Sequence, residues 1–171
     1  MMDKKYIDKI TFDTSVELRG LVLDLTIDIE RRIDDCLSEY FCKNEKVAID
    51  LHECLWATER ITLGSKKDIL FILLKRHKPE YLKLNPTFLG LLDNLIPHRN
   101  IFAHLEIDYD RSGPTNDKYA IVFKKYKNGK IDPKTYTVTE IHQITHDLKE
   151  IAKRLSEITP IKPPQTSSAT D

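Results

Sequence analysis

The clearest pattern in the chain is a row of apolar side chains that advances by three and four positions between residues 18 and 41. This spacing is typical of one face of an α-helix, and Thr14 followed by Glu17 has the form of a capping box at its start. Leu23 and Ile27 widen the apolar surface beyond a single stripe. The sequence therefore predicts one long helix from residue 14, buried on two sides, as inside a bundle or beneath a dimer partner. The row consists of Leu18, Val22, Leu25, Ile29, Ile33, Cys36 and Tyr40.

Two more helices are predicted in the middle of the chain. Ser65 followed by Asp68 opens a helix over residues 66–77, whose apolar centre indicates burial and which Pro79 ends. Asn85 has the character of an N-cap, with Pro86 in the first helical position of the next helix. The inward row of that helix is Phe88, Leu92, Leu95, Arg99 and Phe102. Residues 43–64 mix helical and alternating patterns and are predicted to be helical.

Beyond residue 110 the pattern changes to a loop at 111–116 and two β-like runs around Asn128-Gly129. A two-residue turn at this dipeptide would place Ile121 opposite Tyr136 and Tyr119 opposite Val138. Thr137 with Glu140 then caps a last helix. The inward row of that helix is Ile141, Ile144, Leu148, Ile151 and Leu155. The predicted fold is mainly α, with a β-hairpin at about 118–138 inserted before the last helix.

The predicted organisation is an N-terminal arm at residues 1–13, a helical domain at 14–158 and a disordered tail at 159–171. The 171 residues include 27 basic and 27 acidic side chains, which argues against a protein that binds polyanions over its whole surface. The charged residues are unevenly distributed along the chain, however. Residues 65–85 and 117–135 each carry six basic and two acidic side chains, whereas residues 24–50 carry eight acidic and four basic ones. A local contact with nucleic acid is therefore compatible with the neutral total.

Several function classes lack their sequence signatures. The N-terminus is charged where a signal peptide is apolar, and the longest apolar run is Ile69–Leu74, so a cytoplasmic protein without a membrane span is expected. Three cysteines without CxxC spacing indicate neither a disulfide framework nor a zinc site. His142 and His146 lie one helical turn apart but have no third ligand nearby, which favours a solvated helix face over a metal site. Glycine-rich phosphate loops, GxSxG and HExxH are absent from the sequence.

The strongest candidate for chemistry is the segment HRNIFAH at residues 98–104. Its polar side chains lie on an otherwise apolar helix, and burying an Arg is costly unless it is paired or faces a wet cleft. On a regular helix Asn100 and His104 share a face, whereas Arg99 and His104 are about 140° apart. Arg99 and His104 can meet only through the reach of the Arg side chain, a kink at Pro97, or a partner chain.

A purely structural interpretation of the same residues is also open. Arg99 would then pair with Glu30 or Asp34, Asn100 would satisfy a backbone carbonyl, and His104 would be a hydrogen-bonded core histidine.

The segment RNIFAH resembles the motif of the HEPN superfamily, in which an Arg is followed by four to six residues and a His. The resemblance includes Asn100 after the Arg and Ala103 before the His, and it extends over the helix at 66–77 and the leucine-rich helix that carries the motif. Outside residues 60–106 it rests on the order of helices within 14–156. It implies an up-and-down helical bundle, to which the hairpin would be an addition.

The resemblance implies a metal-independent RNA endonuclease of a toxin or antiviral-defence system, working as a homodimer without cofactor. His104 would be the general acid or base at the ribose 2′-hydroxyl, Arg99 would stabilise charge on the phosphate, and Asn100 would orient them. Candidate RNA contacts are Lys66, Lys67, Lys75, Arg76 and His98. The expected partners are RNA, a second copy of the chain, and an antitoxin or defence protein. The alternative is a non-catalytic HEPN-like interaction or regulatory module, similar to mannitol-operon repressor-like or antitoxin-associated proteins.

Overall fold

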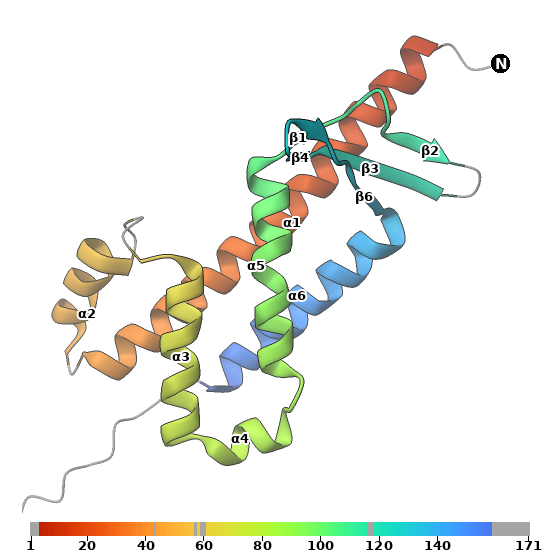
Figure 1. The fold of residues 1–171 in the computed structure, drawn as a ribbon. Helices are drawn as coiled ribbons and strands as arrows, with labels where there is room; N and C mark the ends of the chain where they lie inside the picture. Colours follow the sequence, from red (N-terminus) through yellow and green to blue (C-terminus); the bar gives the residue numbers. More distant parts are fainter. Residues whose placement is uncertain (1–3, 43, 57, 59–60, 116–117, 159–171) are drawn as a thin grey trace, which may run out of the picture. The chain divides into compact units, whose positions relative to one another are not determined.

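The computed structural model describes residues 4–42, 44–56, 58, 61–115 and 118–158 of the chain. It is mainly helical with a small antiparallel sheet before the last helix, which confirms the predicted class (Figure 1). The helices are α1 (Lys4–Phe41), α2 (Glu45–Leu51) with the π-helical turn η1 (His52–Trp56), α3 (Leu63–His77), α4 (Pro79–Leu84), α5 (Phe88–His104) and α6 (Val138–Ile158). The predicted tail at 159–171 lies outside the described residues.

The chain forms two compact units, which are described separately below. The sheet unit comprises residues 1–28 and 93–150, and the helical unit comprises residues 29–92 and 151–171. Their boundaries fall inside α1, α5 and α6.

In the sheet unit, α1 begins at Lys4, so the predicted helix start at Thr14 was wrong, and residues 4–13 of the predicted arm are helical. The inward row of α1 continues N-terminally through Thr11 and Ser15, both buried. One side chain contacts both residues: the Tyr119 hydroxyl donates to the backbone carbonyl of Thr11 at 2.6 Å and lies 3.1 Å from Ser15 Oγ. Hydrogen-bonded hydroxyl residues thus occupy core positions that an apolar pattern does not reveal.

The sheet is built around β3 (Lys118–Lys124), which pairs antiparallel with β1 (Glu106–Ile107), β2 (Gly113–Thr115) and β6 (Lys134–Thr137). The predicted pairing of Ile121 with Tyr136 is confirmed. The predicted pairing of Tyr119 with Val138 is wrong, because β6 ends at Thr137 and Val138 begins α6. Tyr119 pairs on the other edge of β3, with Pro114. The predicted loop at 111–116 contains β2, which starts at Gly113 with a φ of +137°. This positive φ favours glycine, and a Cβ there would also crowd α1, at 3.3 Å from Thr11 Oγ1.

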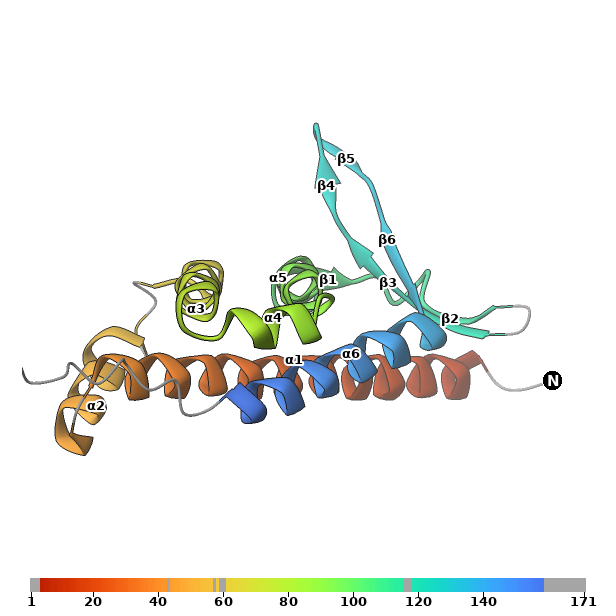
Figure 2. The same cartoon turned by 90° about the horizontal axis from the view of Figure 1, so that it is seen from below.

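The hairpin ends in a short second ribbon of β4 (Tyr126–Lys127) and β5 (Lys130–Ile131). Asn128 and Gly129 form its turn with φ values of 51° and 73°, as the two-residue turn requires. Figure 2 shows this ribbon extending away from the β3–β6 pair, with none of the other elements that the structure describes in the sheet unit beside it.

The core of the sheet unit joins α5, the sheet and α6. The rings of Phe102, Phe123 and Tyr136 pack within 5.0–6.0 Å of one another. The predicted capping box of α6 is confirmed: the Thr137 backbone N–H donates to Glu140 Oε2 at 2.7 Å and the Glu140 N–H donates to Thr137 Oγ1 at 3.2 Å. The predicted inward row of α6 is buried, with Ile141, Ile144 and Leu148 in the sheet unit and Ile151 and Leu155 in the helical unit.

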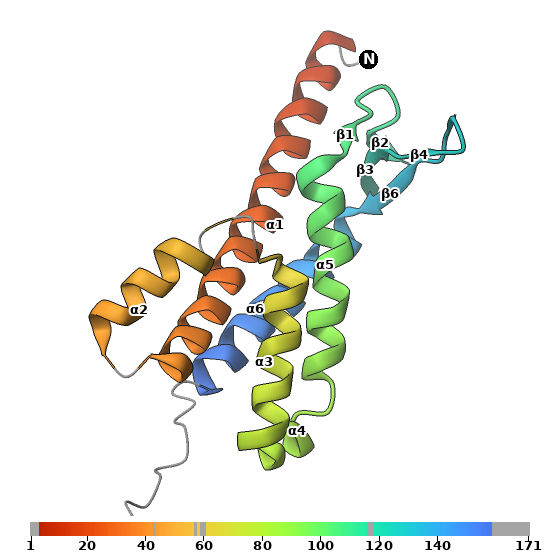
Figure 3. The ribbon, with the colours of Figure 1, turned by 60° about the vertical axis from the view of Figure 1, so that its left-hand side comes forward.

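In the helical unit, α2 lies beside the C-terminal end of α1, and α4 follows α3 after a sharp turn (Figure 3). The helical prediction for residues 43–64 is confirmed at 45–56. Helix α3 begins at Leu63 rather than Lys66, with Thr62 as N-cap. Asn85 was predicted to open the next helix, but its side chain donates to the Tyr81 carbonyl and ends α4 instead. Searched over the described residues, no helix is both long and apolar enough to cross a membrane.

Candidate active site

The last two turns of α5, in the sheet unit, bring together the three residues of the sequence motif. Arg99 Nη1 lies 2.9 Å from His104 Nε2 and 3.4 Å from Asn100 Oδ1. His104 and Asn100 are exposed, and Arg99 is half-exposed. The long Arg side chain thus spans the angular gap that a regular helix leaves between Arg99 and His104.

The contact between Arg99 and His104 has a defined donor and acceptor. A guanidinium only donates hydrogen bonds, so Nε2 of His104 accepts in this contact. Nη1 supplies both hydrogen-bond contacts of Arg99, to Asn100 and His104, so within the described residues Nε and Nη2 are available to a phosphate. The arrangement offers a proton acceptor next to a forked cation that matches a phosphate.

The C-terminal end of α5 is held by a second arginine that the sequence analysis did not identify. Arg19 of α1 donates from Nη2 to the carbonyl of Ala103 at 2.9 Å. The last carbonyls of a helix have no partner within it and carry partial negative charge, so a cation there is stabilising. Arg19 lies four residues after Ser15 and three before Val22, which are both buried, so it belongs to the inward row of α1. A charged residue in an inward row is the sequence signal that could have identified it.

His98 contacts the sheet. Its Nδ1 lies 3.1 Å from the hydroxyl of Tyr136 on β6, and the two rings meet edge-on at 5.7 Å. Burial, with a smaller contribution from Lys134, lowers the pKa of His98, while burial and Glu140 raise the pKa of Tyr136 to about 12. His98 is therefore a neutral contact between α5 and β6, and its placement gives no support to the predicted RNA contact.

Lys66 was predicted to contact RNA, and the structure contradicts this. Its side chain is 2% exposed, and Nζ donates to Glu30 Oε1 and Asp34 Oδ2 at 2.9 Å and to the Trp56 carbonyl at 2.8 Å. The reason is that α1 presents two carboxylates to a buried position of α3, and a buried charge must be paired. The same contacts give Glu30 and Asp34 a partner other than Arg99, and the exposure of His104 argues against the core-histidine alternative.

The other predicted RNA contacts lie on α3, in the helical unit, whereas the motif belongs to the sheet unit. Lys67 pairs with Asp68 at 3.2 Å, and Lys75 Nζ lies 4.0 Å from the centre of the Phe71 ring. Arg76 is exposed at the end of α3.

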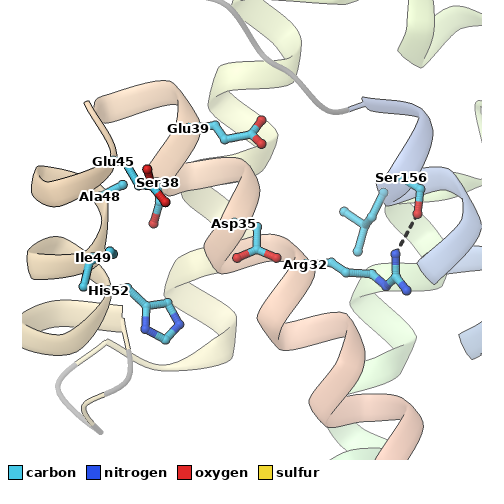
Figure 4. A pocket seen from close by; sticks show the side chains of 10 residues that line it. Arg32, Asp35, Ser38, Glu39, Glu45, Ala48, Ile49, His52 and Ser156 are labelled. Carbon is cyan, nitrogen blue, oxygen red and sulfur yellow. Dashed lines mark hydrogen bonds between the residues drawn. The ribbon is translucent and has the colours of Figure 1, made fainter. Parts of the chain in front are cut away.

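The helical unit also contains an open groove of about 810 Å³, lined by the C-terminal parts of α1 and α6 and by α2 with η1 (Figure 4). Asp35, Glu39 and Glu45 line it, and Arg32 is engaged with Ser156 Oγ at 2.7 Å. Burial and the charge of Asp35 raise the pKa of Glu39. This acidic lining is unsuited to a phosphate.

Among the residues that the structure describes, no three or more His, Cys, Asp and Glu side chains are grouped so that they could hold a metal ion. Comparisons of the chain with models of protein families, with curated proteins and with solved structures found no significant match. Any functional conclusion therefore depends on the chemistry of the residues themselves.

Proposed function

We propose that the protein is a metal-independent RNA endonuclease of the HEPN type, in which Arg99 and His104 act on the ribose 2′-hydroxyl and the adjacent phosphate. The observation that carries the proposal is the 2.9 Å contact between Arg99 Nη1 and His104 Nε2 at the protein surface. A neutral imidazole can accept a proton, and a guanidinium supplies the permanent positive charge that a transferring phosphoryl group requires.

The proposed reaction begins when Arg99 turns its guanidinium from His104 to the phosphate oxygens and so exposes Nε2. The ribose 2′-oxygen attacks phosphorus while its proton passes to Nε2 of His104. The bond between phosphorus and the 5′-oxygen breaks, and that oxygen takes up a proton. The products are a 2′,3′-cyclic phosphate and a 5′-hydroxyl.

A second imidazole, protonated, is the simplest proton donor to the leaving 5′-oxygen, and a second copy of the chain would supply it. An exposed apolar row on α1, within the sheet unit, supports the proposal of a second copy. One face of α1 carries apolar residues at spacings of four, seven and four positions. They are Phe12, Val16, Leu23 and Ile27. Phe12, Val16 and Ile27 are about half exposed, at 50%, 46% and 47%. Exposed apolar stripes of this kind mark protein interfaces.

The proposal is tested by incubating the purified protein with RNA in EDTA and mapping the ends of the products. His104→Ala and Arg99→Ala should each lower the cleavage rate by roughly 10² to 10⁴, the contribution expected of a positioned acid or base. Arg99→Lys should restore little, because an ammonium cannot fork onto a phosphate. His142→Ala removes another exposed histidine, on α6, and should cleave at the wild-type rate.

Cleavage that survives in both motif variants, or that requires a divalent cation, would refute the proposal. A protein that dimerises but leaves RNA intact would instead favour the non-catalytic interaction module, for which the exposed stripe on α1 is the supporting observation.

A further inference from the structure

We infer that the end of the β-hairpin, residues 124–134, is the element that binds the RNA strand; this inference rests on the proposed function. We call this segment the basic ribbon. It contains five lysines and one aspartate. Lys124 is paired with Glu106 at 2.6 Å, whereas within the described residues Lys125, Lys127 and Lys130 have no carboxylate at ion-pair distance.

The strand register puts two of these lysines in direct opposition. Lys127 pairs with Lys130 and Tyr126 with Ile131, in the same register that joins β3 to β6. Side chains alternate between the two faces of a ribbon, so the Lys pair lies on one face and the Tyr–Ile pair on the other. Like charges directly opposite each other destabilise a sheet, and a two-stranded ribbon is marginal by itself. The Lys pair therefore opposes folding of the ribbon, and a bound anion would relieve the repulsion.

The second face of the ribbon offers a ring for stacking. Tyr126 is 65% exposed and Ile131 is 47% exposed. Lysines that follow a backbone, together with an exposed aromatic ring, are the chemistry with which proteins bind single-stranded nucleic acid. Two apolar side chains form too small a patch for a stable protein interface, and a duplex would hide its base faces from Tyr126. Single-stranded RNA is thus the partner that both faces fit.

The ribbon is joined to the motif by a short series of contacts inside the sheet unit. Lys134 Nζ lies 5.3 Å from the centre of the Tyr136 ring. The hydroxyl of Tyr136 lies 3.1 Å from Nδ1 of His98, the residue before Arg99. The basic ribbon is therefore joined through β6 to His98, in the last two turns of α5, which also carry the proposed catalytic residues.

The experiment measures binding of a fluorescein-labelled 20-nucleotide single-stranded RNA by anisotropy, in His104→Ala protein so that the probe stays intact. One variant, called the ribbon variant, combines Lys125→Gln, Lys127→Gln and Lys130→Gln. Its matched control is Lys46→Gln, Lys149→Gln and Lys153→Gln, three exposed lysines outside the ribbon. The ribbon variant should bind at least tenfold more weakly, and the slope of log affinity against log salt should fall by about 2, since each single-strand phosphate contact contributes about 0.7.

A second pair of variants tests the ring. Tyr126→Ala should weaken binding of the single strand roughly tenfold, and Tyr126→Phe should leave it unchanged, because stacking requires the ring and not the hydroxyl. Circular dichroism checks that each variant keeps the wild-type helix content.

Equal affinity of the ribbon variant and its control for single-stranded RNA would overturn the inference. It would also be overturned if His104→Ala protein bound duplex RNA as tightly as the single strand, or bound an acidic polypeptide such as polyglutamate more tightly. The failure of the proposed function looks different. If His104→Ala protein binds RNA through the ribbon while the wild type does not cleave it, the ribbon assignment stands and the nuclease proposal falls. If the wild type cleaves RNA and the ribbon variant binds and cleaves it equally well, the nuclease proposal stands and the ribbon assignment falls.

Discussion

Replacing Lys66 by Met would leave Asp34 buried without its cation. The side chains of Lys66 and Asp34 are 2% and 5% exposed, and the ammonium serves Asp34, Glu30 and the Trp56 carbonyl at 2.8–2.9 Å. Removing one partner of a buried ion pair costs about 3–5 kcal/mol. With a urea slope of about 2 kcal/mol per M, the midpoint of unfolding of the Lys66→Met variant should fall by roughly 2 M. The matched control is Lys75→Met, an exposed lysine of the same helix that lies over the Phe71 ring, for which a change of at most about 1 kcal/mol is expected.

The same variant has a characteristic pH dependence. Burial raises the pKa of Asp34, and Lys66 only partly offsets this. A carboxyl whose folded pKa lies above its unfolded value binds its proton more tightly in the folded state, so lowering the pH through the folded pKa relieves the cost of the buried charge. Removing Lys66 raises the pKa of Asp34 further, because Lys66 lowers it. The loss of stability in Lys66→Met should therefore be largest at pH 8 and smaller at pH 5, and Asp34→Asn in the same chain should recover part of it.

Urea titrations at both pH values, followed by circular dichroism, measure these differences. If Lys66→Met stays within 1 kcal/mol of the wild type at pH 8 but loses affinity for RNA, the buried-pair reasoning is wrong and Lys66 is the surface cation that the sequence suggested.

Three further outcomes are expected. Thr137→Ala removes the N-cap of α6 and should cost about 1 kcal/mol in thermal unfolding, whereas Thr137→Ser should cost little. Gly113→Ala should destabilise the contact of β2 with α1 by about 1–3 kcal/mol, seen as faster amide exchange in β2 and β3, because φ is +137° and the new Cβ meets Thr11. His98 should titrate below its usual 6.5 by NMR, and Lys134→Gln should move the pKa upward. Because that pKa is lowered, the stability His98 contributes is present above 6.5 and is lost as the pH falls through the lowered value.

Local signals in the sequence were sufficient for several elements. Asn128-Gly129 set the register of the hairpin, because both residues adopt the positive φ that a two-residue turn requires. Thr137 and Glu140 are three residues apart, so their capping box forms within one helical turn wherever α6 lies.

Elements that depend on distant partners were missed or misplaced. The start of α1 was placed ten residues too late because Thr11 and Ser15 are buried through Tyr119, more than one hundred residues away in sequence. Strand β2 was read as a loop because its pairing with β3 and its close approach to Thr11 are tertiary contacts.

The sequence by itself determined a mainly helical chain with a hairpin, and it supplied Arg99, Asn100 and His104 on one helix. These follow from periodicity, caps and turn residues, whose physical causes lie within a few residues of one another. Only the tertiary structure decided what the charged groups do. It buried Lys66 against carboxylates 32 and 36 residues away, joined Arg99 to His104 through one side-chain conformation, and placed Arg19 on the last turn of α5. A charge takes its role from the groups that surround it after folding, and those groups come from distant parts of the chain.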